Sequence, residues 1–206
     1  MNTTPPAARS RSALRIALLP LALLAFVLPP VAQAHVGLGD AGGLAHGLAH
    51  PLTGLDHLCA MLAVGLWAFQ RGGRAVWLVP LVFLGVMALG GALGVAGIAL
   101  PFVERGIVAS VLVLGVLIAA ATRLPLLASA LLVGVFALFH GHAHGAEMPA
   151  TASGLAWGTG FLISTASLHV AGIVIARLVS RAGQPRLVRL AGAAVAMCGL
   201  WLAVSG

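Results

Sequence analysis

The chain has 206 residues, of which 61% are apolar and only 7% are charged. Its mean hydropathy is +1.10, whereas soluble domains carry about 25% charged residues, so this composition excludes an ordinary soluble protein. The net charge of +7 does not indicate nucleic-acid binding, because the basic residues, all of them arginine, stand at the ends of apolar runs, where they are typical of membrane topology.

Residues 1–34 have the pattern of a cleavable signal peptide. Three arginines lie in the first part, an apolar stretch follows, and the segment ends in Ala32-Gln33-Ala34. A basic start, a short apolar core and an Ala-x-Ala end predict cleavage after Ala34, which would make His35 the first mature residue. The alternative is an uncleaved first helix, against which the two prolines just before this end argue.

The mature chain, residues 35–206, is predicted to be an all-α polytopic membrane helix bundle that forms a single transmembrane domain. A spanning helix needs about 20 mostly apolar residues. About six such stretches follow in order, at 48–69, 75–99, 106–122, 124–141, 153–177 and 187–204. With a periplasmic mature N-terminus, the inner turns hold seven arginines and the outer turns only Arg105, as the positive-inside rule demands. We therefore expect a multi-pass protein of the bacterial inner membrane.

Ionisable side chains inside these spans gather in two short motifs, one in the first span and one at the end of the fourth. Their members are His50, Asp56, His57, His140, His144 and Glu147. Titratable groups at membrane depth are costly and mark functional sites, and imidazole with carboxylate suits borderline divalent metals such as nickel, cobalt, zinc and copper. Both motifs lie toward the outer half of the bilayer in the predicted topology, so together they predict a metal site.

The spacing within each motif adds detail. His140 and His144 are four residues apart, so both can face one ion from a regular helix. His50 and His57 are seven apart, about 10 Å along a regular helix, so one ion cannot reach both. Because a proline and a glycine lie between them, we predict an unwound segment at 50–55 that folds His50 back toward His57. Asp56 is either a direct ligand or a group that orients one.

The other four histidines are possible ligands with plain alternatives. His35 would place an imidazole beside a free amine after cleavage. His46 stands four residues before His50, or is merely interfacial, and His142 is either a ligand or a solvated loop residue. His169 lies deeper, in the fifth span, where it could line an inward path. The two cysteines lie in apolar runs and are expected to be packing residues with no disulfide between them.

At these residues the sequence resembles the HupE/UreJ family of nickel and cobalt permeases. The run from His50 through Pro51 and Gly54 to Asp56-His57 is similar to the family's first signature. The run Phe139 to Glu147 is similar to its second, and Leu168-His169-x-x-Gly172 to a third, weaker feature. The resemblance covers essentially the whole mature chain.

The resemblance implies uptake of nickel or cobalt to supply metalloenzymes such as hydrogenase or urease, with the six motif residues as the functional positions. We accordingly expect a transporter and not an enzyme, with no tightly bound cofactor. Its partners would be the divalent ion and the lipid bilayer, with no nucleic acid. No lysine-containing phosphate loop is present, so hydrolysis of ATP through such a loop is excluded. The sequence ranks neither nickel over cobalt nor one oligomeric state over another.

Three other functions remain open at this stage. A membrane sensor or chaperone could bind the metal without moving it. Histidines facing one another across helices could ligate a b-type haem, although here they crowd with carboxylates at one end. An intramembrane metal-dependent hydrolase is a third alternative, but the sequence has no HExxH motif.

Overall fold

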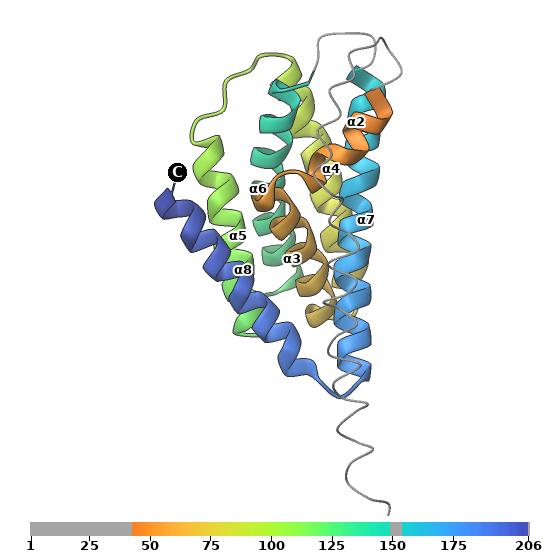
Figure 1. Cartoon of the computed structure of the whole chain (residues 1–206), viewed down its shortest axis with the longest axis vertical. Helices are drawn as coiled ribbons and strands as arrows, with labels where there is room; N and C mark the ends of the chain where they lie inside the picture. The colour runs from red at the N-terminus through yellow and green to blue at the C-terminus, as the bar shows by residue number, and fades with distance from the viewer. Residues whose placement is uncertain (1–42, 149–153, 206) are drawn as a thin grey trace, which may run out of the picture. The chain divides into compact units, whose positions relative to one another are not determined.

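The computed structural model describes residues 43–148 and 154–205, and in these two ranges the regular structure is entirely helical (Figure 1). The helices are α2 (Gly43–Ala49), the 3-10 turn η1 (His50–Leu52), α3 (Leu55–Arg71), α4 (Ala75–Val95), α5 (Val103–Ala119), α6 (Leu126–Ala146), α7 (Gly154–Arg181) and α8 (Pro185–Ser205). The predicted all-α class is confirmed, and every predicted span corresponds to a helix or helix pair. The predicted signal peptide and His35 lie outside the described residues.

The helices differ in their ability to cross a bilayer. In the described ranges, α4, α6, α7 and α8 are long and apolar enough to span, and the bent pair 43–52 with 55–71 makes up to five. The remaining helix, α5, has 17 residues, or about 25 Å at 1.5 Å per residue. It starts with Glu104 and Arg105 in its first turn. The six predicted spans therefore correspond to four long helices, one broken pair and one shorter helix.

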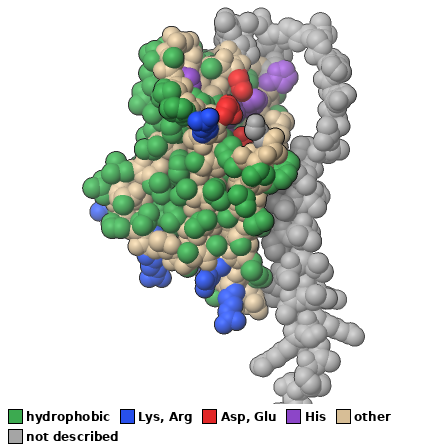
Figure 2. Space-filling model, turned by 90° about the vertical axis from the view of Figure 1, so that its left-hand side faces the viewer, with side chains coloured by type: hydrophobic (Ala, Val, Ile, Leu, Met, Phe, Trp, Pro, Cys, Tyr) green, Lys and Arg blue, Asp and Glu red, His purple; other side chains and the backbone are tan. Residues whose placement is uncertain are grey.

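The outside of the described bundle is apolar, as a lipid-facing surface must be. Large side chains such as Leu127, Leu131 and Leu155 are 71%, 62% and 84% exposed, and Figure 2 shows hydrophobic groups covering the middle of one face. In the same view basic side chains gather at one end, while acidic and histidine side chains lie toward the other. This uneven distribution of charge follows from the up-and-down path of the chain. The turn between α3 and α4 and the turn between α7 and α8 both carry arginines and lie at the same end.

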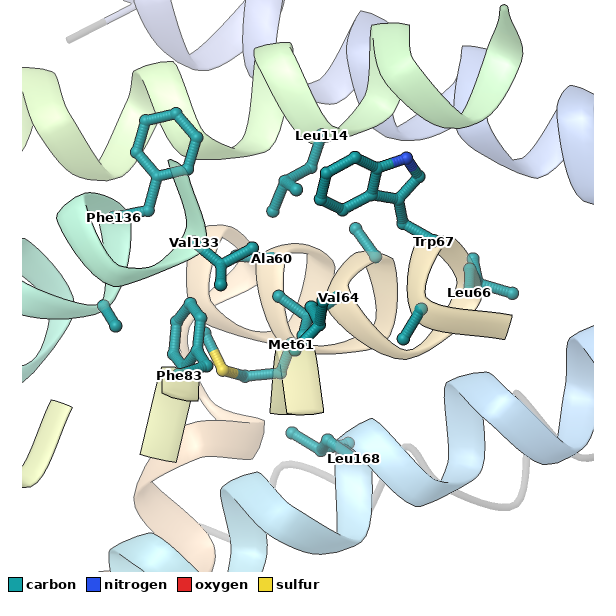
Figure 3. Packing of buried hydrophobic residues seen from close by; sticks show 14 of the residues in the cluster. Ala60, Met61, Val64, Leu66, Trp67, Phe83, Leu114, Val133, Phe136 and Leu168 are labelled. Atoms are coloured by element: carbon teal, nitrogen blue, oxygen red, sulfur yellow. The ribbon is translucent and has the colours of Figure 1, made fainter. Parts of the chain in front are cut away.

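Helix α3 forms the centre of the core. Its side chains Met61, Val64 and Trp67 are fully buried and pack with Phe83 of α4 and Leu114 of α5 (Figure 3). The indole nitrogen of Trp67 donates a hydrogen bond of 3.2 Å to the carbonyl oxygen of Thr122, so this aromatic residue has its one polar atom satisfied. The core therefore holds α3 firmly between its neighbouring helices.

Glycines join the helices into three closely packed groups, α2 and α3 with α7, α4 with α6, and α5 with α8. At each contact, a Cβ atom on the glycine would meet backbone atoms of the neighbouring helix at less than about 3 Å. The glycines concerned are Gly47, Gly65, Gly160 and Gly172 in the first group, Gly90, Gly94, Gly141 and Gly145 in the second, and Gly115, Gly192 and Gly199 in the third. Small residues allow helices to approach closely where no hydrophobic effect draws them together in lipid.

Candidate metal-binding site

The first span breaks between η1 and α3, as the sequence predicted for residues 50–55. The axes of the two pieces differ by 79°. Pro51 lies in η1 and has no backbone N–H to continue the helix, and Gly54 is extended at φ −94° and ψ 122°. Both the backbone N–H and the hydroxyl of Thr53 donate to the carbonyl oxygen of His50, at 3.1 and 2.8 Å. The break therefore has hydrogen bonds of its own.

Helix α6 carries the second motif without a break. His140 and His144 lie one turn apart, and Glu147 follows immediately after the last helical residue, Ala146. His140 is fully buried, His144 is 15% exposed and Glu147 is 59% exposed. One face of α6 thus leads from the interior to the surface through three side chains that could each ligate a metal ion.

The bend brings the two motifs together around His144. Its Nδ1 lies 3.0 Å from Nε2 of His50 and 3.2 Å from Oε2 of Glu147. Its Nε2 lies 3.1 Å from Nδ1 of His57. The same oxygen of Glu147 is 3.3 Å from Nε2 of His50. Residues nearly a hundred positions apart in the sequence therefore form one continuous cluster.

Two groups of three ligands can be drawn from this cluster, and within each the ligand atoms lie within 4.8 Å of one another. We call His57, His140 and His144 the inner group, and His50, His144 and Glu147 the outer group. The inner group is buried, whereas the outer one reaches the surface through Glu147. Nitrogen with one carboxylate oxygen is a donor set that first-row divalent ions accept.

Asp56 is the motif residue that the structure does not bring into either group. Its Oδ1 accepts a 2.8 Å hydrogen bond from the backbone N–H of His57, within the first turn of α3. There a carboxylate interacts favourably with the free N–H groups of the helix start. Asp56 thus holds the backbone next to His57.

The additional candidate histidines lie outside both groups. His46 is exposed on α2, and Nε2 of His142 lies 2.7 Å from the carbonyl oxygen of Ile98, where it can donate. His169 is 1% exposed on α7, and neither of its ring nitrogens has a hydrogen-bond partner among the described residues. The edge of its ring meets Phe83, which also flanks His140, with centroids 5.2 and 6.0 Å away. His169 and His140 therefore share this phenylalanine as a neighbour.

The two cysteines are free thiols, as expected. Their sulfur atoms are 3.7 Å apart across α3 and α8, and neither belongs to the outer or inner group.

Sequence reasoning missed the partners that surround the cluster. Phe161 of α7 lies against three of the imidazoles, with centroids 4.7 Å from His144, 5.0 Å from His57 and 6.1 Å from His50. It stacks on Trp157 at 5.3 Å and 8°. A lone phenylalanine in an apolar helix carries no signal that could have identified it. The rings exclude water from one side of the site and fix the imidazole planes.

Two hydroxyl groups support the inner group. The Ser110 hydroxyl donates to the carbonyl oxygen of Ile107 at 2.6 Å, so its oxygen is free to accept from Nε2 of His140 at 2.9 Å. Nε2 of His57 lies 3.4 Å from Oγ1 of Thr165. Such partners set which ring nitrogen carries the proton. For His140 the lone pair is left on Nδ1, which is buried and has no partner among the described residues.

A partly open cavity of about 400 Å³ lies beside the cluster, between α4, α6 and α7. Its lining is mostly apolar and includes Met87, Met148, Trp157 and Phe161, while His144 forms part of one wall. The imidazole that joins the two groups is thus reached from outside the cluster on this side.

Together, the fold and the site define a polytopic α-helical membrane protein with a histidine-rich candidate metal site. The comparisons with known proteins give its family. The model of the family described as HupE / UreJ protein matches residues 21–202, and the chain belongs to this family. It is 51% identical over 183 residues to Protein HupE of Rhizobium leguminosarum bv. viciae, covering 88% of this chain and 95% of that protein. No solved structure matches.

Proposed function

We propose that this protein takes up divalent nickel or cobalt across the bacterial inner membrane through the cluster around His144. The observation that carries the proposal is the convergence of five ligand side chains from two distant motifs on one point. Uncompensated polar groups at this depth would be costly. Binding of a transported cation explains why all five polar side chains lie together, and the family resemblance of both motifs supports nickel or cobalt as that cation.

The proposed path follows the change in exposure along the cluster. A hydrated ion meets the exposed carboxylate of Glu147 and the half-buried ring of His50 first. It then loses water as it reaches the buried imidazoles of His57 and His140. His169, whose two ring nitrogens have no partner among the described residues, would receive it next, on the way to the arginine-bearing end. That end faces the cytoplasm in the proposed orientation.

The geometry disfavours the haem alternative. The ring nitrogens of His50, His57 and His144 approach one another to 3.0–3.1 Å, which leaves no space for a porphyrin between two axial ligands. A binding-only sensor shares the same metal site, so a transport measurement has to separate it from a permease.

Radioactive nickel uptake by cells that lack their own nickel transporters tests the proposal. Wild type should take up nickel at sub-micromolar concentration, and His57→Ala should not, at equal amounts of protein in the membrane. His142→Gln is the matched control, because its amide can still donate to the Ile98 carbonyl outside the cluster. Excess cobalt or zinc then measures selectivity. A well-expressed wild type that binds nickel but shows no uptake above background would refute transport and favour the sensor.

A further inference from the structure

The outer and inner groups share one side chain, and they use opposite sides of it. Nδ1 of His144 faces His50 and Glu147 of the outer group, whereas Nε2 faces His57 of the inner group. A neutral imidazole has one lone pair and one N–H. His144 can therefore ligate an ion in one group only while its other nitrogen carries the proton.

We infer that the cluster holds one ion at a time in two alternating positions, and that His144 transfers it from the outer to the inner position by exchanging its tautomer. This inference rests on the proposed function, since it describes how the ion passes through that site. It assigns His144 a role that the other four ligands do not have.

Each tautomer of His144 has a hydrogen-bond acceptor where it needs one. With the ion on Nδ1, the N–H at Nε2 donates to Nδ1 of His57 across 3.1 Å. With the ion on Nε2, the N–H at Nδ1 donates to the carboxylate of Glu147 across 3.2 Å. The proton that leaves Nε2 passes to solvent through the partly open cavity that His144 lines, and Nδ1 takes up a proton from solvent at the exposed carboxylate of Glu147. The ring therefore starts and ends neutral.

The donor atoms of the two positions fit capture of the ion at the outer position and release of the ion from the inner position. The outer position contains the carboxylate of Glu147, which attracts a cation and offsets its charge as water is lost. The inner position contains three imidazoles in a buried setting, including the unpartnered Nδ1 of His140. Because the inner position has no carboxylate, it holds a dication less strongly by charge. The ion is thus released more readily from the inner position than from the outer one.

Nickel binding to the purified, detergent-solubilised full chain tests the inference without relying on transport. Equilibrium dialysis should give about one ion per chain for wild type, because one lone pair serves both positions. Glu147→Gln should still bind about one ion, at least 10-fold more weakly, at the inner position. His140→Gln should bind about one ion with nearly wild-type affinity, because the outer position is intact. X-ray absorption should show loss of the carboxylate ligand only in Glu147→Gln. His144→Gln should weaken binding most, and the control His142→Gln should match wild type.

A methyl group on one nitrogen of His144 provides the sharpest test. A full chain whose His144 carries a methyl group on Nδ1 can ligate only through Nε2, so it should bind nickel at the inner position but lose at least 10-fold in uptake. Two ions per wild-type chain, or wild-type uptake by the methylated chain, would overturn the shared-ligand mechanism. If wild type shows no uptake at all, the proposed function fails, whereas one-ion stoichiometry with separable positions would still support the shared ligand.

Discussion

The close packing of α6 on α4 leads to a prediction about the distance between these helices, which can be changed without replacing any of the proposed ligands. In Gly141→Ala, the new Cβ would overlap the carbonyl oxygen of Met87 and lie 2.8 Å from its carbonyl carbon, whereas ordinary contact begins at 3.4 Å. The helices must therefore separate by at least about 0.6 Å, three times the roughly 0.2 Å tolerance of metal–ligand distances. Overpacking of this kind costs about 1–3 kcal/mol. The ion can restore the spacing only against that strain, so nickel affinity should fall about 5- to 150-fold.

The matched control is Gly134→Ala on the same helix. Its Cβ would lie 3.8 Å from side-chain atoms of Val82 and Val86, which is ordinary contact, so nickel affinity should stay within about twofold of wild type. Equilibrium dialysis of both purified variants gives the affinities, and gel filtration confirms that each is folded. Equal affinities for folded Gly141→Ala and Gly134→Ala would refute the argument that the backbone contact between α4 and α6 sets the ligand spacing.

Three further predictions concern the ion and its path. Protons compete with metal for imidazole lone pairs, so nickel uptake should weaken as the pH falls; uptake that does not depend on pH would count against imidazole ligation. His169→Leu should retain nickel binding at the cluster but lose uptake, as dialysis and radioactive uptake on the same variant would show, and full uptake would remove His169 from the path. Nickel at 100 times its dissociation constant should stabilise the folded protein by about 2.7 kcal/mol, measured as a rise in melting temperature that His144→Gln abolishes.

Much of the fold and the core of the site follow from local sequence. The length of the apolar runs was sufficient to predict the helices, and the proline and glycine between His50 and His57 predicted the break in the first span. The four-residue spacing of His140 and His144 predicted that both side chains lie on the same face of one helix. The same spacing separates His142 from these two residues, because a residue two positions along a helix faces the opposite side, and its Nε2 lies 2.7 Å from the carbonyl oxygen of Ile98.

Other features depend on tertiary contacts that no local pattern encodes. His46 is four residues before His50, but α2 ends at Ala49 and the 3-10 turn η1 begins at His50, so the spacing of a regular helix does not hold between them. Asp56 could not be assigned between ligand and orienting group, since that depends on whether its carboxylate turns toward the cluster or toward its own backbone. Phe161 and Ser110 contact the imidazoles from helices whose neighbours are set only when the bundle assembles.

The glycine contacts have a mechanical consequence for the cargo. His50 and His57 belong to the group formed by α2, α3 and α7, whereas His140, His144 and Glu147 belong to the pair formed by α4 and α6. Backbone-to-backbone packing makes each group of helices rigid. Relative motion is therefore expected mainly at the seam, the boundary between the two groups, where the proposed ligands meet. A bound ion would cross-link the two groups at this seam, and its departure would let them move more freely against each other. The loaded and empty proteins would then differ in stiffness more than in shape.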